Sequence, residues 1–186
     1  MGFHHETERL VMRDWQEGDS DRFYEAMNTP AVMKWLGGVQ DRATWDAAHD
    51  RIQSYQRDFG FTFWILERKD NGELIGFCGL KRINYEDAPN KGDVEIGWRL
   101  RESAWGKGYA KEAAAASLDL AFDRFGAEEV IAVTVGPNEA SWGLMLRLGM
   151  TERPELAYDD RKLSPLHGPV RQWAISKAEW QARSAG

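Results

Sequence analysis

The chain has 186 residues, of which 42% are hydrophobic and 29% are charged, and this composition is typical of one globular domain with a substantial core. Acidic residues outnumber basic residues by 30 to 24, which gives a net charge of −6. This balance disfavours a protein whose main partner is nucleic acid or an anionic membrane. The single cysteine, Cys78, excludes an intrachain disulfide and a cysteine-based zinc cluster, and it suits a reducing compartment.

Tryptophan is abundant, and targeting signals are absent from the sequence pattern. The nine tryptophans exclude a disordered chain and indicate large flat surfaces, and they stand at positions 15, 35, 45, 64, 98, 105, 142, 173 and 180. The first residues lack a basic segment followed by an apolar run, and no apolar stretch approaches the ~20 residues of a membrane span. We therefore expect a cytoplasmic protein without a signal peptide.

The first part of the chain predicts one strand and then helices. A strand is expected over residues 8–13, followed by a helix that Asp19 or Ser20 caps. A second, short helix is expected to begin at Pro30. Large apolar residues then recur with a 3-4-3-4 spacing, which is one face of a helix, at positions 45, 48, 52, 55 and 59.

The remainder predicts a strand meander and then alternating helices and strands. Strands are expected over 61–67, 73–83 and 93–100, and Asn71-Gly72 predicts a hairpin between the first two. The next expected elements are a helix over 109–125, a strand over 129–135, a helix over 139–148 and a strand over 169–175. Ser176 and Glu179 form a capping box that opens a terminal helix. This order predicts a mixed α/β fold in a single domain over residues 1–186.

The most informative segment runs from Trp98 to Ala110, where a strand passes through a turn with two glycines into an alanine-rich helix. Such a turn directs several main-chain N–H groups and the positive end of the helix dipole at one point, which suits a phosphate or pyrophosphate. Gly106 and Gly108 would let the anion approach the main chain closely. The spacing is neither that of a Walker loop nor that of a dinucleotide-binding turn. A plain strand-to-helix turn is the alternative.

This segment resembles the acetyl-CoA loop of the GNAT acyltransferase superfamily, Gln/Arg-x-x-Gly-x-Gly/Ala, as Trp105-Gly106-Lys107-Gly108-Tyr109-Ala110. The tryptophan in place of Gln/Arg is familiar from the RimJ/RimL-like branch. Further stretches match that branch in order, and they are Thr7-Glu8-Arg9-Leu10 with Met12-Arg13, Leu74-Ile75-Gly76-Phe77-Cys78-Gly79, Val94-Glu95-Ile96-Gly97-Trp98, and Asn138-Glu139-Ala140-Ser141 through Leu148-Gly149-Met150. The resemblance covers about residues 7–180. It implies a GNAT fold: a mostly antiparallel, twisted central sheet of six to seven strands with a V-shaped splay, flanked by helices.

The resemblance also implies an N-acetyltransferase that moves an acetyl group directly from acetyl-CoA to a primary amine, on a small molecule or a protein N-terminus. The pantetheine arm would lie along Gly97 to Leu100 like an added strand, and a main-chain N–H near Trp98 would stabilise the oxyanion. The residues expected to bind CoA are Gly97, Trp98, Arg99, Leu100, Trp105, Gly106, Lys107, Gly108, Tyr109, Ala110, Asn138, Ser141 and Met145. Acetyl-CoA and an amine acceptor are the expected partners, without metal, nucleic acid or membrane, and a homodimer is left open.

Two residues are expected to take part in catalysis. Glu95, in an otherwise apolar strand, is the candidate general base, and burial there would raise its pKa; a structural or substrate-orienting role is the alternative. Many family members protonate the leaving thiolate with a tyrosine, but the equivalent position here is Met145. Ser141 is the replacement that the branch suggests, unless the site merely requires a small residue. Asn138 is expected to bind pantetheine, with a plain helix cap as the alternative.

The sequence says least about the site that binds the acceptor amine. In the family the first two helices and the last hairpin build it, which makes Trp35, Trp64 and the loop 158–161 candidates for its wall. Cys78 is expected to be a small buried residue without a catalytic role. Because the tyrosine is absent, a non-catalytic acyl-CoA-binding sensor or partner subunit with the same fold is the alternative function.

Overall fold

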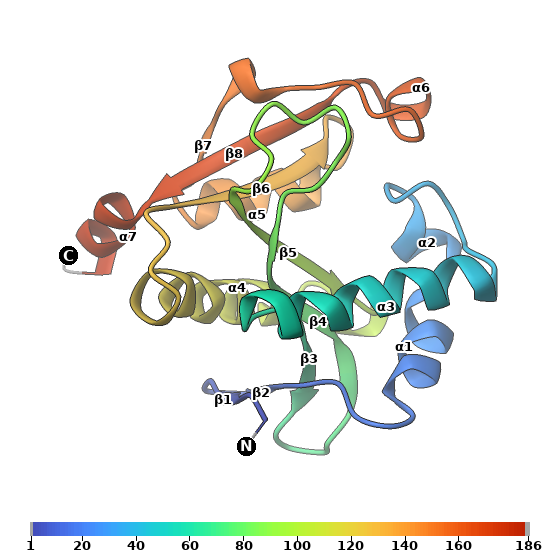
Figure 1. The fold of residues 1–186 in the computed structure, drawn as a ribbon. Coiled ribbons are helices and arrows are strands. Elements are labelled where there is room, and N and C mark those ends of the chain that lie inside the picture. The colour runs from blue at the N-terminus through green and yellow to red at the C-terminus, as the bar shows by residue number, and fades with distance from the viewer. Residues whose placement is uncertain (1, 185–186) are drawn as a thin grey trace. The chain divides into compact units, whose positions relative to one another are not determined.

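The computed structural model describes residues 2–184 (Figure 1). The strands are β1 (His4–Glu6), β2 (Leu10–Arg13), β3 (Phe63–Arg68), β4 (Leu74–Arg82), β5 (Val94–Leu100), β6 (Glu129–Val135), β7 (Thr151–Glu152) and β8 (Val170–Ser176). The helices are α1 (Asp19–Met27), α2 (Pro30–Met33), α3 (Arg42–Phe59), α4 (Tyr109–Asp119), α5 (Glu139–Arg147), α6 (Ser164–His167) and α7 (Lys177–Ser184). Within this described range, no helix is long and apolar enough to span a bilayer.

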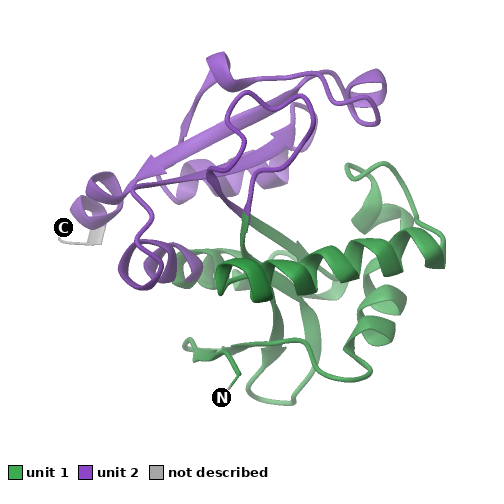
Figure 2. Ribbon diagram, in the orientation of Figure 1, with its two compact units in different colours: residues 1–81, 97–116 green, residues 82–96, 117–186 purple. Residues whose placement is uncertain are grey.

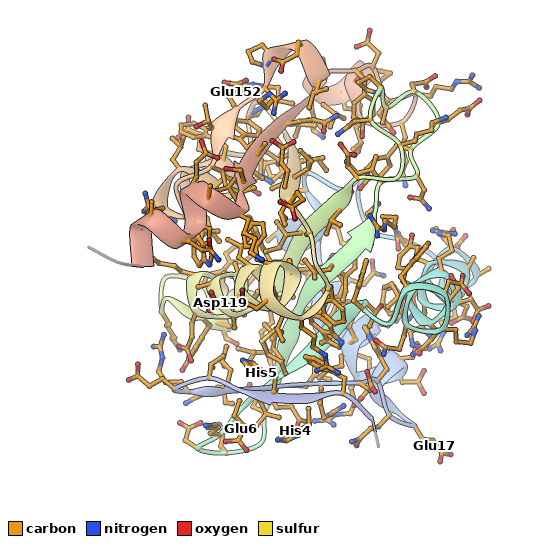
Figure 3. The ribbon with its side chains drawn as sticks, turned by 60° about the vertical axis from the view of Figure 1, so that its left-hand side comes forward. His4, His5, Glu6, Glu17, Asp119 and Glu152 are labelled. Carbon is orange, nitrogen blue, oxygen red and sulfur yellow. The ribbon has the colours of Figure 1, made fainter. Side chains whose placement is uncertain are left out.

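The strands form one open sheet, hydrogen-bonded in the order β1-β2-β3-β4-β5-β6-β8-β7. The predicted mixed α/β fold is thereby confirmed, but the expected six to seven strands are wrong, because the sheet has eight strands. The two additional strands are β1, whose three residues are labelled in Figure 3, and β7, which has two residues. Segments this short offer too few alternating positions for a periodic signal.

The chain divides into two compact units, which Figure 2 colours green and purple. Among the described residues, unit 1 comprises 2–81 and 97–116, and unit 2 comprises 82–96 and 117–184. The boundaries cut through β5 after Ile96 and through α4 after Ala116. Consequently Glu95 belongs to unit 2, whereas Gly97 and the glycine-rich turn belong to unit 1.

Helices α1, α2 and α3 pack on β3 and β4 to form the core of unit 1. Four aromatic rings stack in series there, with centroid distances of 5.0 Å from Trp45 to Phe23, 5.1 Å from Phe23 to Phe77 and 4.8 Å from Phe77 to Phe63. The 3-4-3-4 spacing of α3 correctly predicts its buried face. Phe59, the last residue of that helix, is the exception at 43% exposed.

A buried ion network in unit 1 joins β2, α1 and β3. The guanidinium of Arg13 donates to the carboxylates of Asp19 at 2.6 Å and Glu67 at 2.5 Å. Asp19 therefore does not cap α1 as predicted, and neither does Ser20, whose hydroxyl accepts a hydrogen bond from α3. The cap position is Gly18, which has a φ of 83°.

Unit 2 is built on β6, whose bounds agree with the predicted strand. β6 pairs antiparallel with β8 along its length and parallel with β5 at Ile131 opposite Glu95. The capping box of α7 is confirmed, because the Ser176 N–H donates to the Glu179 carboxylate at 2.8 Å and the Glu179 N–H donates to the Ser176 hydroxyl at 3.3 Å.

The predicted helix over 109–125 is interrupted. Regular α-helix ends at Asp119, labelled in Figure 3, and a π-helical turn over Leu120–Arg124 follows. The carboxylate of Asp119 accepts a hydrogen bond of 2.7 Å from Trp180 Nε1 on α7. The apolar spacing that predicted one continuous helix does not distinguish an α-turn from a π-turn, because both keep a similar face buried.

Candidate functional site

The turn between β5 and α4 has the backbone geometry of an anion site. β5 ends at Leu100, a 3₁₀ turn spans Glu102–Ala104, and α4 begins at Tyr109. Gly106 and Gly108 have φ angles of 70° and 83°, a left-handed conformation that residues with a Cβ rarely adopt. Residues 105–108 are exposed.

The main-chain donors of this turn are those of a helix start. The N–H of Glu112 donates to the Gly108 carbonyl at 3.1 Å and so begins the helical hydrogen-bond series. The N–H groups of the residues before it belong to the first turn, which has no carbonyl partner inside a helix. The positive end of the helix dipole lies at the same place, so the turn can accept a phosphate as its sequence predicts.

Side chains of unit 1 hold this turn in shape. Trp105 Nε1 donates to the Leu100 carbonyl at 2.8 Å, which folds the half-exposed indole back on the end of β5. Arg9, from the turn between β1 and β2, donates from Nη1 to the Lys107 carbonyl at 2.9 Å. The sequence did not predict this role of Arg9. The signal available was its place in the Thr7-Glu8-Arg9-Leu10 motif, which matches the same branch as the loop motif.

Close packing explains two of the glycines that precede the turn. A Cβ on Gly97 would lie 3.0 Å from the ring of Phe63, the last of the four stacked rings. A Cβ on Gly76 of β4 would lie 2.1 Å from the carbonyl oxygen of Arg99, so only glycine lets β4 and β5 approach this closely. The Arg99 guanidinium lies over the Phe77 ring, 5.3 Å from its centroid, and lines a pocket with Tyr24.

In unit 2, Glu95 is buried and hydrogen-bonded. Its side chain is 4% exposed, and its Oε1 accepts a hydrogen bond of 2.9 Å from the hydroxyl of Tyr85. The Tyr85 ring stacks on Tyr158 with 5.9 Å between centroids. Burial, followed by the negative charge of Glu95, raises the pKa of Tyr158 well above its ordinary value, so that this phenol keeps its proton. Sequence reasoning missed Tyr85, because nothing local relates a loop tyrosine to a residue ten positions later.

The start of α5 presents the remaining predicted residues of unit 2. Asn138 stands at the cap position of α5, but its side chain makes no cap hydrogen bond. Its Nδ2 instead donates to the Thr134 hydroxyl at 3.0 Å, which orients the amide. Ser141 is half-buried one turn later. Met145 is 1% exposed and packs in the interior on α5.

The predicted site residues therefore fall into two groups by unit. Unit 1 holds Gly97, Trp98, Arg99 and Leu100 on β5, Trp105, Gly106, Lys107 and Gly108 in the turn, and Tyr109 and Ala110 at the start of α4. Unit 2 holds Glu95, Asn138, Ser141 and Met145. Among the described residues, no group of three or more His, Cys, Asp or Glu could hold a metal ion.

Other predicted positions have structural roles. Trp64 is fully buried and stacks on Phe3 with 4.1 Å between centroids, so its expected place in an acceptor wall is wrong. Trp35 is half-buried, and the Lys34 ammonium lies over its ring. Asp160 accepts the main-chain N–H groups of the two residues that follow Arg161, which makes it a turn residue. Cys78 is buried, as predicted.

Comparison with known proteins identifies the family. The model of the acetyltransferase (GNAT) domain matches residues 9–151. The chain belongs to the GNAT acetyltransferase family. The uncharacterized N-acetyltransferase p20 of Bacillus licheniformis is 30% identical over 179 residues, which are 94% of this chain and 96% of that protein. The protein is therefore an acyltransferase of the N-acetyltransferase kind.

Solved GNAT structures share the fold. An acetyltransferase from Agrobacterium tumefaciens superposes with a TM-score of 0.80 at 24% identity, covering 94% of this chain and 95% of that chain. The spermidine N-acetyltransferase of Vibrio cholerae, solved in complex with CoA and spermine, gives a TM-score of 0.69 at 18% identity, covering 92% of this chain and 98% of that chain. At these identities the likeness concerns the fold.

Proposed function

We propose that this GNAT enzyme transfers the acetyl group directly from acetyl-CoA to a primary amine, on a small molecule or a protein N-terminus. One observation carries the proposal: β5 holds the buried carboxylate of Glu95 and runs on into a turn whose two left-handed glycines open α4. The turn is suited to the pyrophosphate of CoA. Glu95 stands two residues before Gly97 in the chain, and we expect the thioester to lie beside Gly97.

We propose that the donor is held by main-chain groups of both β5 and the turn. Gly97 to Leu100 would pair with pantetheine, and the N–H groups at the start of α4 would bind the pyrophosphate. Lys107 is exposed beside them and can approach a phosphate. The amide of Asn138 has a second N–H besides the one donated to Thr134, and we assign it to pantetheine.

The proposed chemistry needs no covalent enzyme intermediate. The amine nitrogen attacks the thioester carbonyl, and a main-chain N–H near Trp98 stabilises the oxyanion that forms. The C–S bond then breaks, and CoA leaves as a thiolate that the Ser141 hydroxyl can hydrogen-bond. Glu95 takes the proton released by the amine, directly or through water, or it orients the acceptor. Tyr85 holds the carboxylate in one position in either role.

For the acceptor we propose a primary amine, on a small molecule or a protein N-terminus, and we keep the half-buried Trp35 as a candidate for the wall of its site.

The finer classification is also a proposal. The five motifs in order support the RimJ/RimL-like branch, and the family match over 9–151 takes in parts of both units, which supports one catalytic domain.

A screen of acceptor amines with acetyl-CoA, detecting the free thiol of released CoA, tests the function. We expect steady thiol release with at least one amine. Tight CoA binding without turnover across a broad panel would instead support the non-catalytic acyl-CoA-binding protein.

A further inference from the structure

We propose that Arg9 and Glu112 form a positioning pair that sets the shape of the CoA-binding turn, and that this is the role of the Thr7-Glu8-Arg9-Leu10 motif. The inference rests on the proposed function, because it assigns a support to the turn proposed to bind the CoA pyrophosphate. Both residues belong to unit 1, as does the turn itself.

The carboxylate of Glu112 gathers three donors from one short segment. Glu112 lies in the first turn of α4, and its Oε1 accepts the Thr7 hydroxyl at 2.5 Å and the Arg9 main-chain N–H at 2.7 Å. Its Oε2 accepts Arg9 Nε at 2.7 Å. These bonds attach the turn between β1 and β2 to the helix start, although the residues are more than a hundred positions apart in the chain.

The guanidinium of Arg9 extends this attachment to the loop. Its Nη1 donates to the Lys107 carbonyl at 2.9 Å, and its Cζ lies 4.6 Å from the centroid of the Tyr109 ring. One planar group therefore binds a helix carboxylate, a loop carbonyl and an aromatic face. A lysine ammonium cannot make this combination, because it is a compact point charge without a fork of fixed donors.

The contact with the Lys107 carbonyl determines where the next N–H points. In a planar trans peptide the C=O and the following N–H point in opposite directions. Once Arg9 holds the Lys107 carbonyl, the N–H of Gly108 is directed away from Arg9, and it cannot rotate freely even though Gly108 is conformationally permissive. This N–H is one of the donors that we assign to the pyrophosphate.

The pair also balances charge at an anion site. Burial by itself would raise the pKa of Glu112, but hydrogen bonds from Thr7 and from the main chain and side chain of Arg9 outweigh it and hold the pKa below the ordinary value of 4.5. Glu112 is therefore ionised at neutral pH. An isolated carboxylate in this helix turn would repel a pyrophosphate, and the positive charge of Arg9 offsets that repulsion.

Binding of CoA and turnover of two donors test the inference. Arg9→Lys and Glu112→Gln should each weaken CoA binding, measured by calorimetry, about tenfold, the effect of losing one charge-assisted hydrogen bond. KM for acetyl-CoA should rise by a similar factor with kcat within about twofold. Turnover of S-acetylpantetheine, which lacks the pyrophosphate, should be unchanged. The double variant should lose no more than the worse single variant, because the two residues act as one unit.

A matched control is Arg42→Lys, which alters an arginine of unit 1 that pairs with Asp21 and Asp46 on α1 and α3. Its CoA affinity should equal that of the wild type. An equal loss with acetyl-CoA and S-acetylpantetheine, or no loss with either, would overturn the positioning role while leaving the proposed function intact. A wild-type protein that binds CoA but acetylates no amine would refute the catalytic proposal, and the binding measurements would still decide the role of the pair.

Discussion

Tyr85 donates its hydroxyl to Oε1 of Glu95 over 2.9 Å, and this bond joins the loop after β4 to a carboxylate that is 4% exposed. A buried carboxylate held in this way keeps one orientation, because the alternative rotamers would forfeit the bond. The geometry therefore supports a Glu95 of fixed position, whether it accepts a proton or orients the acceptor amine.

Replacing Glu95 by Gln should lower kcat by about 100-fold or more, the lower end of what a general base contributes. Glutamine has the same shape and can still accept the Tyr85 hydrogen bond through its oxygen, so the melting temperature should stay close to that of the wild type. Steady-state kinetics at saturating acetyl-CoA measure the effect. An unchanged kcat would leave Glu95 with a structural role only.

The companion variant Tyr85→Phe separates orientation from proton transfer. It removes one hydrogen bond, so kcat should fall by no more than about tenfold. KM for acetyl-CoA should not change, because Tyr85 belongs to neither the turn nor the start of α4. A loss as large as that of Glu95→Gln would indicate that Tyr85 itself takes part in the proton transfer.

Stability at alkaline pH should depend on Tyr158. Burial and the charge of Glu95 raise its pKa above the ordinary value of 10.0, so the folded state favours the protonated phenol. The stabilisation from a raised pKa is complete below pH 10 and is lost as the pH rises above it. Denaturant unfolding between pH 8 and about pH 11 should show a steeper loss for the wild type than for Tyr158→Phe. If the unfolding free energies of the two proteins change in parallel with pH, the raised pKa of Tyr158 is contradicted.

Gly97→Ala should destabilise the protein by about 1–3 kcal/mol, the usual cost of overpacking. The added Cβ would lie 3.0 Å from the Phe63 ring, and the stack of Phe77, Phe23 and Trp45 behind that ring restricts its retreat. Thermal unfolding measures the loss. If the clash with the ring is the cause, adding Phe63→Leu should recover part of the lost stability. If the effects of the two substitutions simply add, the clash is not the cause.

Arg13→Ala should cost about 3–5 kcal/mol, because it leaves the carboxylates of Asp19 and Glu67 without their shared cation in a buried position. Arg42→Ala, which removes a half-exposed arginine from its own two carboxylates, should cost far less, because solvent screens exposed ion pairs. Urea unfolding of the two variants gives the comparison. Similar losses of unfolding free energy in the two variants would show that burial of the Arg13 network adds nothing to stability.

By itself the sequence determined the features that depend on neighbouring residues. The two left-handed glycines of the turn, the buried face of α3, the strand β6 and the capping box at Ser176 and Glu179 all follow from local backbone preferences or short periodicities. The motif order was likewise sufficient to indicate the GNAT family, which the family match confirms.

Only the tertiary structure decided which distant residues meet. Arg9 with Glu112, and Tyr85 with Glu95, are contacts between segments that no local pattern relates, and the burial of Trp64 against Phe3 is another. The strands β1 and β7 exist because neighbouring strands pair with them, not because their own residues prefer the conformation. Local preferences determine how a segment folds, whereas packing between segments determines what its side chains can do.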